Sequence, residues 1–362
     1  MSPTKVLVTG ATGYVGGSVL STLLNSPNPD VKALSISALV RQQEQADVLR
    51  AKGVNGIVFS GLDDTDVARR VASENDIVIN TASAFHAEAA EAIINGLADR
   101  QKATGKKSVL IHTSGTSSIG DRPITGRYTE THVFDDSKDD IYAYLRKRED
   151  IEPYQQRTTD LVVLEQGEDA GITTYILMSP TIYGIGSGLF NRTSIQIDAI
   201  IRAAQRDGVT TVIGAGKAHW DHVHIEDLAR LYELLLARVL AVTGASAPGG
   251  AGAGDLPPSN KRGIYFNETG HHSWREVSER VAAAGKQVGR LATAEVREET
   301  LEAASPKLGK TLTPFVAELG FSSSARTQAS RARQLLGWTP QKNRRDFEDS
   351  FVAEWDYLAG EF

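Results

Sequence analysis

The chain begins with a short apolar strand that runs straight into a glycine-rich turn and a helix. Segment 5–9 is followed by Gly10, Gly13 and Gly16, and apolar residues then recur at helical spacing. Gly10 permits a tight turn, Gly13 lets the backbone approach an anion, and Gly16 lets the helix lie close to the sheet. The helix N-terminus offers unpaired N–H groups and the positive end of a dipole. This context predicts a site for the pyrophosphate of a dinucleotide.

Strand and helix patterns alternate through the first half of the chain. The segments typical of strands are apolar runs at 5–9, 35–40, 56–59, 76–81, 108–112 and 173–178. The segments typical of helices lie between them, at 14–25, 43–52, 65–74, 87–104 and 159–169. Apolar strands separated by helices indicate a parallel sheet that is covered on both faces. We therefore expect an α/β fold with a doubly wound parallel sheet and a ligand at the carboxyl ends of its strands.

The pattern changes after Pro180. Segment 244–259 is rich in glycine, alanine, proline and serine, and such a composition cannot bury enough apolar surface to order by itself. The expected division is a dinucleotide-binding domain at 1–182, with 210–242 returning to it, a smaller, mostly helical C-terminal substrate lobe at 183–209 and 260–362, and a flexible insertion at 244–259.

Composition narrows the class of protein. The 362-residue chain has 39 basic and 45 acidic residues, a formal net charge of −6 and no cysteine. The acidic balance disfavours a nucleic-acid partner, and the lack of cysteine excludes disulfides and thiolate chemistry. No segment approaches the roughly 20 apolar residues that span a bilayer, and the first apolar run is too short for a signal peptide. We expect a cytoplasmic protein that binds a small-molecule substrate, without a metal site or a membrane anchor. A homodimer is compatible with the sequence.

Several motifs, taken together, resemble those of a known family. They are T-G-A-T-G-Y-V-G at 9–16, D-I-V-I-N-T-A at 76–82, H-T-S-G at 112–115, S-P-T-I-Y-G at 179–184, D-H-V-H-I-E-D-L-A at 221–229 and L-L-G-W-T-P at 335–340. In this order they resemble an extended or atypical short-chain dehydrogenase/reductase of the NAD-dependent epimerase/dehydratase-like group. The resemblance implies a Rossmann domain, a nicotinamide dinucleotide and hydride-transfer chemistry.

The resemblance also implies where the cofactor lies. The residues expected around it are Gly10, Thr12, Gly13, Tyr14, Val15, Gly16, Arg41, Leu62, Asp63, Thr81, Ala82, Ser83, Thr113, Pro180, Thr181 and Ile182. Asp63 could equally be the N-cap of a helix that starts near residue 65, since aspartate favours that position. The turn after the second strand carries Arg41 and no carboxylate, and an arginine there can hold a 2′-phosphate. We therefore expect NADP as the cofactor, with NAD as the alternative.

The family's catalytic serine has a counterpart in this chain, but its tyrosine–lysine pair has none. By resemblance, Ser114 should polarise the substrate oxygen. None of the 10 tyrosines is followed four residues later by a lysine. Tyr154 leads the helix that aligns with the catalytic one, and Thr158 stands where the lysine would be. In the family that lysine lowers the pKa of the tyrosine and holds the nicotinamide ribose. The catalytic machinery is therefore altered or absent.

Two other tyrosines have a cation at the family's spacing. Tyr142 and Tyr144 are each followed four residues later by an arginine. Arginine does not replace lysine conservatively at a positioned site, and Pro153 ends that helix too early for the usual connection to the next strand.

Two further residues are candidate proton donors. Tyr183 directly follows the segment expected near the nicotinamide. His222 would share one strand face with Trp220 and His224 if segment 220–225 is extended, and imidazole titrates near neutral pH. Packing in the core is the alternative for both residues.

Two functions fit these observations. The first is an NADP-dependent oxidoreductase of the atypical short-chain class that acts on a small carbonyl or hydroxyl substrate, with a proton from Tyr183, Tyr154, His222 or solvent. The alternative is an NADP-binding, catalytically silent regulator similar to NmrA-like proteins, which keep the dinucleotide fold and lose the tyrosine–lysine pair. Sugar-nucleotide dehydration is disfavoured, because residues 113–116 lack the Asp-Glu pair that dehydratases carry there.

Overall fold

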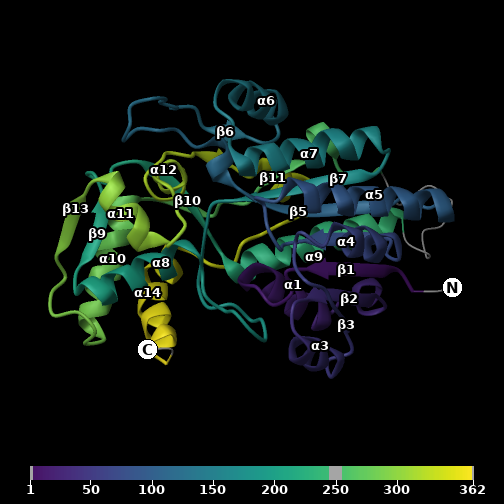
Figure 1. The fold of residues 1–362 in the computed structure, drawn as a ribbon, viewed down its shortest axis with the longest axis horizontal. Coiled ribbons are helices and arrows are strands. Elements are labelled where there is room, and N and C mark those ends of the chain that lie inside the picture. Colours follow the sequence, from purple (N-terminus) through teal and green to yellow (C-terminus); the bar gives the residue numbers. More distant parts are fainter. Residues whose placement is uncertain (1–2, 244–254, 361–362) are drawn as a thin grey trace.

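A computed structural model describes residues 3–243 and 255–360, and a seven-stranded parallel sheet forms its centre (Figure 1). In spatial order the strands are β11 (Ile264–Phe266), β7 (Thr173–Ser179), β5 (Val109–Gly115), β4 (Ile77–Asn80), β1 (Lys5–Thr9), β2 (Ser35–Val40) and β3 (Asn55–Val58). The strand order reverses at β1, which pairs with both β2 and β4. Ligands of such sheets bind at this reversal, outside the carboxyl ends of the strands. The predicted doubly wound α/β fold is confirmed.

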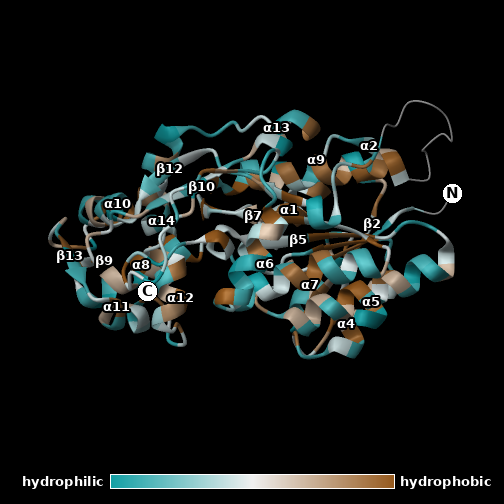
Figure 2. Cartoon of the chain, turned by 90° about the horizontal axis from the view of Figure 1, so that it is seen from above, coloured by the Kyte–Doolittle hydropathy of each residue, from teal (hydrophilic) through white to brown (hydrophobic). Residues whose placement is uncertain are grey.

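Helices cover both faces of the sheet (Figure 2). One face carries α4 (Thr65–Ser73), α5 (Ala87–Thr104) and α7 (Gln155–Asp169), and the other carries α1 (Tyr14–Leu24) and α9 (Ile225–Thr243). The short helices α2 (Pro29–Lys32) and α3 (Gln43–Arg50) and the helix α13 (Ser330–Leu336) complete this part of the molecule. Because both faces are covered, Val6, Leu7 and Val8 of β1 are all buried, which explains the continuous apolar run in the sequence. Within the described ranges, no helix is long and apolar enough to cross a membrane.

A smaller, mostly helical part lies at one end of the molecule (Figure 1). Its helices are α8 (Gln196–Asp207), α10 (Trp274–Gln287), α11 (Leu301–Leu308), α12 (Pro314–Phe321) and α14 (Arg344–Ala359). Its strands are β9 (Thr210–Ile213) and β13 (Val296–Glu299), and a separate three-stranded sheet contains β8 (Thr181–Tyr183), β10 (His219–His224) and β12 (Gly270–Ser273). The remaining elements are α6 (Ile141–Ile151) and the paired strands β6 (Phe134–Asp135) and β14 (Thr327–Gln328).

The structure differs from the predicted domain division in two short strands. Strand β11 lies in the range assigned to the smaller lobe, yet it pairs with β7 at the edge of the large sheet. Strand β9 lies in the range expected to return to the dinucleotide-binding domain, yet it pairs with β13. Both pairings join segments about 90 residues apart in the sequence, so no local pattern reveals them. Most of the predicted insertion, at 244–254, lies outside the described residues.

Candidate functional site

The glycine-rich turn sits against the end of β4, where only glycines fit. Gly10 has a φ of +72°, and a Cβ on it would lie 2.7 Å from the Ala82 nitrogen. A Cβ on Gly16 would lie 2.2 Å from the Thr81 hydroxyl oxygen. Gly13 is the N-cap of α1, and no side chain caps this helix terminus. The turn therefore leaves backbone N–H groups at the start of α1 without a capping side chain, and such groups can bind a pyrophosphate.

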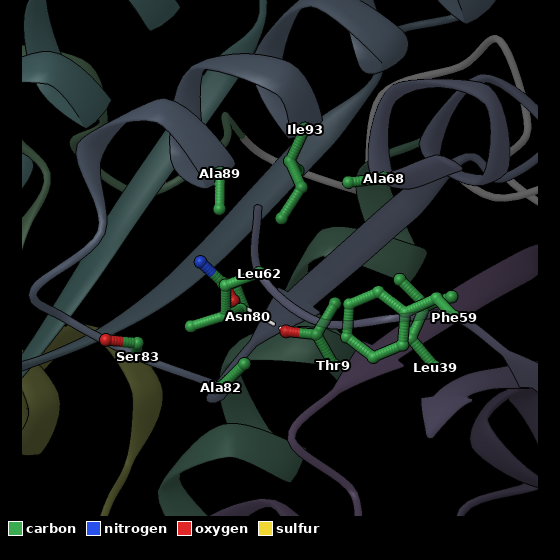
Figure 3. Close-up of a pocket in the computed structure, with 10 residues that line it drawn as sticks. All are labelled: Thr9, Leu39, Phe59, Leu62, Ala68, Asn80, Ala82, Ser83, Ala89 and Ile93. Atoms are coloured by element: carbon green, nitrogen blue, oxygen red, sulfur yellow. Dashed lines mark hydrogen bonds between the residues drawn. The ribbon is translucent and has the colours of Figure 1, made fainter. Parts of the chain in front are cut away.

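A small pocket opens beside this turn, at the carboxyl ends of β1 to β4 (Figure 3). It is lined by Thr9, Leu39, Phe59, Leu62, Ala68, Asn80, Ala82, Ser83, Ala89 and Ile93. Leu62, Ala82 and Ser83 are three of the residues predicted to contact the cofactor. Mainly apolar walls with a few polar groups suit a flat aromatic ring such as adenine.

Asp63 lies on the surface next to this pocket and does not cap a helix. The N-cap of α4 is Asp64, whose Oδ1 accepts a hydrogen bond from the Val67 N–H (3.4 Å). The Asp63 carboxylate is exposed and lies 2.9 Å from His86 Nε2. His86 Nδ1 accepts a hydrogen bond from the Ala89 N–H, so in the neutral ring Nε2 carries the proton and donates it to Asp63. The helix-capping role that the sequence offered for Asp63 is therefore wrong, because the adjacent Asp64 caps α4.

Arg41 lies near the pocket and carries an unpaired guanidinium among the described residues. It follows directly after β2, and Leu39 two residues earlier lines the pocket. Arg41 is exposed and has no ion pair or hydrogen bond with any residue at 3–243 or 255–360. A free guanidinium at this edge is a ready donor for a phosphate.

A loop that follows β8 lies over the glycine-rich turn. The Asn191 N–H donates to the Thr12 carbonyl oxygen (3.2 Å), and the Tyr14 hydroxyl donates to the Gly184 carbonyl oxygen (2.5 Å). The Tyr14 ring is buried, and burial raises its pKa well above the usual value. Because the Tyr14 side chain is occupied in this way, only its backbone N–H could contact the predicted cofactor.

The buried carboxyl group of Glu354 in α14 anchors this loop. Its oxygens accept hydrogen bonds from the Gly184 N–H (3.0 Å) and from the Ser194 hydroxyl (3.3 Å). Burial raises the pKa of Glu354 to about 8, although the two hydrogen bonds act in the opposite direction. The C-terminal helix thus contributes to the shape of the cofactor site through one buried acid.

Glu354→Gln should make the protein more stable at pH 8 and change its stability little at pH 5. Below about pH 4.5 the carboxyl is protonated in both the folded and unfolded chains. Between that value and about 8 the unfolded chain releases a proton that the folded chain keeps, so stability falls as pH rises. Glutamine mimics the protonated acid and removes this loss, which is of the order of a few kcal/mol. Thermal unfolding at both pH values measures it, with exposed Glu91→Gln as the control. An equal effect of Glu354→Gln at both pH values would contradict the prediction.

The segment predicted near the nicotinamide is held by internal hydrogen bonds. The Thr113 hydroxyl lies 2.5 Å from the Tyr232 hydroxyl, and the Thr181 hydroxyl donates to Gln196 Oε1 (2.8 Å). The pairing of β5 with β7 places Gly115 opposite Ser179, directly before the 180–182 segment. The carboxyl end of β5 is therefore the part of the sheet closest to that segment.

The Ser114 side chain is directed toward Asp160 of helix α7. It is buried, its hydroxyl has no hydrogen-bond partner that satisfies normal geometry, and it acts on the carboxyl group of Asp160 in α7. Burial raises the pKa of Asp160 to about 7, and the hydroxyls of Ser118 and Ser114 lower it in part. Gln156, which lies against Gly115, is one turn before Asp160 on the same helix, so α7 covers both Ser114 and Gly115. This placement favours a structural role for Ser114 over the predicted contact with the substrate oxygen.

Tyr154 sits at the start of α7 and contacts the segment that follows β5. Its hydroxyl lies 3.2 Å from the Ser117 hydroxyl oxygen, and Ser117 donates in turn to the side-chain oxygen of Gln156. Burial raises the pKa of Tyr154 to about 12. The nearby Arg157 guanidinium lies 5.8 Å from the ring centre, but it is bonded to the Ser118 carbonyl oxygen and to Glu149. Tyr154 therefore remains protonated near neutral pH.

Tyr183 and His222 lie in a buried aromatic cluster. The Tyr183 ring lies 5.5 Å from the His222 ring and 5.1 Å from the Phe347 ring. His222 stacks on Phe347 at 3.9 Å, and its Nδ1 lies 3.1 Å from His272 Nδ1. Burial lowers the pKa of His222 to about 3 and raises that of Tyr183. The geometry favours the packing alternative for both residues.

Hydrogen-bonded polar side chains, which were not predicted from the sequence, connect the neighbouring strands β1, β4 and β5. The Thr9 hydroxyl donates to Asn80 Oδ1 (2.5 Å), and the Asn80 amide lies 2.9 Å from His112 Nδ1. Burial lowers the pKa of His112 to about 4, so its ring is neutral. The sequence did contain a signal for these residues, because each is a polar residue at or near the end of a predicted apolar strand. For Ser117 and Gln156 the sequence offers no comparable signal.

The described residues contain no group of three or more histidine, aspartate or glutamate side chains that could hold a metal ion. The candidate site consists of a glycine cradle, a mainly apolar pocket, an arginine directly after β2, and a tyrosine at the start of α7. The glycine turn after the first strand of a parallel sheet defines a Rossmann-type, dinucleotide-binding class of protein.

The family comparison agrees with this class. A model of the NAD dependent epimerase/dehydratase family matches residues 6–245. This match spans more than half of the chain, so the chain belongs to that family.

Individual relatives extend over most of the chain. It is 28% identical over 346 residues to oxidase ucsJ of an Acremonium species, covering 93% of this chain and 92% of that protein. It is 26% identical over 243 residues to an uncharacterized protein of Saccharomyces cerevisiae, covering 65% of this chain and 71% of that one.

Solved structures share the fold at low sequence identity. UDP-glucuronic acid 4-epimerase from Bacillus cereus, with UDP-glucuronic acid and NAD, has a TM-score of 0.60 at 15% identity, covering 99% of this chain and 100% of that one. DesIV, a dTDP-glucose 4,6-dehydratase from Streptomyces venezuelae with NAD bound, has a TM-score of 0.64 at 16% identity, covering 98% and 97%.

Proposed function

We propose that the protein is an NADP-dependent oxidoreductase that acts on a small carbonyl or hydroxyl substrate. The observation that supports the proposal is the Tyr154 hydroxyl, which donates to Ser117 just beyond the end of β5, the strand whose Gly115 pairs with Ser179. The glycine cradle and the pocket would hold the pyrophosphate and the adenine. Arg41, which is free of other ionic partners among the described residues, would hold the 2′-phosphate. When bound, the nicotinamide supplies or accepts a hydride.

The surroundings of Tyr154 favour a substrate with an apolar body. The Tyr154 ring is flanked edge-on by Phe85 and Phe315, with ring centres 5.9 and 5.7 Å away. Phe85 comes from the loop before α5 and Phe315 from α12, so both parts of the molecule contribute. Aromatic walls with few convergent polar groups are typical of sites for small apolar molecules.

The state of Tyr154 favours reduction of a carbonyl group. Without a neighbouring lysine its pKa stays near 12, so around neutral pH the phenol holds a proton that it can give to the substrate oxygen. Water would then return a proton to the phenolate. The reverse reaction needs a base, and a buried phenol with this pKa is a weak source of one.

The test is binding and turnover with the purified protein. We expect NADPH to bind more tightly than NADH by calorimetry. We also expect NADPH to be consumed in the presence of at least one member of a panel of aliphatic and aromatic aldehydes and ketones, followed at 340 nm. Tyr154→Phe should lower kcat about 100-fold or more and leave the dissociation constant of NADPH unchanged, because only the proton donor is removed. NADPH binding without turnover of any panel member would contradict the proposal.

The second candidate is an NADP-binding regulator without catalytic activity. Thr158, which stands in place of the family's lysine, favours it. For this candidate we expect selective NADP binding, no carbonyl turnover and a protein partner whose affinity changes with NADP. Rapid NADPH oxidation by any panel substrate would rule it out.

A further inference from the structure

We propose that the side-chain amide of Gln156, together with the Tyr154 hydroxyl, forms the donor pair that holds the substrate oxygen. This inference rests on the proposed function and identifies the group that acts where the family's serine would be expected.

The position of the Gln156 amide carries the proposal. A Cβ on Gly115 would lie 2.8 Å from Gln156 Nε2. The amide nitrogen therefore occupies the space that a side chain at position 115 would fill. Gln156 Nε2 donates no hydrogen bond to any residue of the described ranges, although the side chain is largely buried. This accessible amide nitrogen, with free N–H donors, can therefore donate to an acceptor atom of a ligand.

The orientation of the amide is fixed by Ser117. The Ser117 hydroxyl donates to Gln156 Oε1 and accepts from the Tyr154 hydroxyl (3.2 Å), so the Tyr154 O–H would turn from Ser117 to a bound substrate oxygen. The carbonyl end of the amide is thereby occupied, and the nitrogen end is directed toward Gly115. Ser117 is a positioning residue in this arrangement, because it joins the two donors without itself being directed at Gly115.

The pair lies at the correct end of the crevice. Gly115 pairs with Ser179, so the Gln156 amide is close to the 180–182 segment that is expected to meet the nicotinamide. Phe85 and Phe315 flank the Tyr154 ring, and donors held beside them would stabilise negative charge that develops on a substrate oxygen. Ser114 would then be unnecessary for this task.

The test uses 4-dimethylaminocinnamaldehyde, whose absorption moves to longer wavelength when its carbonyl oxygen accepts hydrogen bonds. The full-length protein is loaded with NADP⁺, so no hydride is available and the readout is binding alone. We expect a red shift with the wild-type protein and loss of most of that shift in Gln156→Met, which has similar size and no donor. Gln155→Met makes the same change at an exposed neighbour and should keep the shift.

Turnover gives the second measurement. Gln156→Met and Gln156→Glu should lower kcat for an aldehyde substrate about 100-fold, with an unchanged NADPH dissociation constant. Thermal unfolding establishes that each variant is folded before either comparison is made. If both folded Gln156 variants keep the red shift and the kcat of the wild-type protein, the inference is overturned and the proposed function stands. If the wild-type protein shows neither shift nor turnover, the proposed function itself is overturned.

Discussion

Arg41→Ala should weaken NADPH binding about 10- to 100-fold and leave NADH binding within about twofold. Arg41 is exposed at the end of β2, next to the pocket that contains Leu39. A charge-assisted hydrogen bond contributes about 1.5–3 kcal/mol, which corresponds to this range of affinity. NADH lacks the 2′-phosphate, so removal of Arg41 does not remove a contact with it. Calorimetric titration of both nucleotides into both proteins measures the four dissociation constants.

Arg127→Ala is the matched control for loss of a positive charge. Arg127 is exposed and does not line the pocket shown in Figure 3. Its removal should change the affinities for NADPH and NADH equally little. If Arg41→Ala weakened both nucleotides to the same extent, Arg41 would act on the shared part of the cofactor and the preference for NADP would need another source.

The large sheet could be predicted from sequence because its pattern is local. Strands β1 and β2 have the predicted bounds, since a strand covered on both faces is a continuous apolar run. Helix α5 also has the predicted bounds, and it ends at Gly105 with a φ of +68°. Strands β11 and β9 could not be placed, because pairing with a distant partner defines them and their own three or four residues do not.

The cofactor part of the site was more accessible from sequence than the catalytic part. The glycine turn is one contiguous motif, and its pocket is formed by the ends of successive strands. The catalytic part depends on which residue of α7 meets each position at the end of β5, and such contacts join segments far apart in the sequence. The sequence therefore identifies Ser114 from its neighbours, whereas the fold brings Gln156, 41 residues further along, to Gly115. That contact depends on the start of α7, which no local pattern determines.

Gly16→Ala and Gly13→Ala should separate folding from cofactor binding within one turn. A Cβ on Gly16 would lie 2.2 Å from the Thr81 hydroxyl oxygen and 2.3 Å from the Gly10 carbonyl oxygen, so the turn must move. We expect a loss of about 2–3 kcal/mol of folding free energy and at least a 100-fold loss of NADPH affinity. Urea unfolding and calorimetry measure the two effects.

Gly13→Ala should keep the fold and lose the ligand. Its φ of −86° suits any residue, and the nearest atom to a Cβ there is the Gly10 carbonyl oxygen at 3.2 Å. We expect the free energy of unfolding to change by less than about 1 kcal/mol, whereas NADPH affinity falls at least 10-fold, because the added methyl group keeps the phosphates away from the backbone. Gly320→Ala is the control for a glycine-to-alanine change in α12, where no atom lies within 4 Å of the new Cβ. If Gly13→Ala bound NADPH as tightly as the wild-type protein, the pyrophosphate could not lie against this turn, and the cradle would have to be sought elsewhere at the carboxyl ends of β1 and β4.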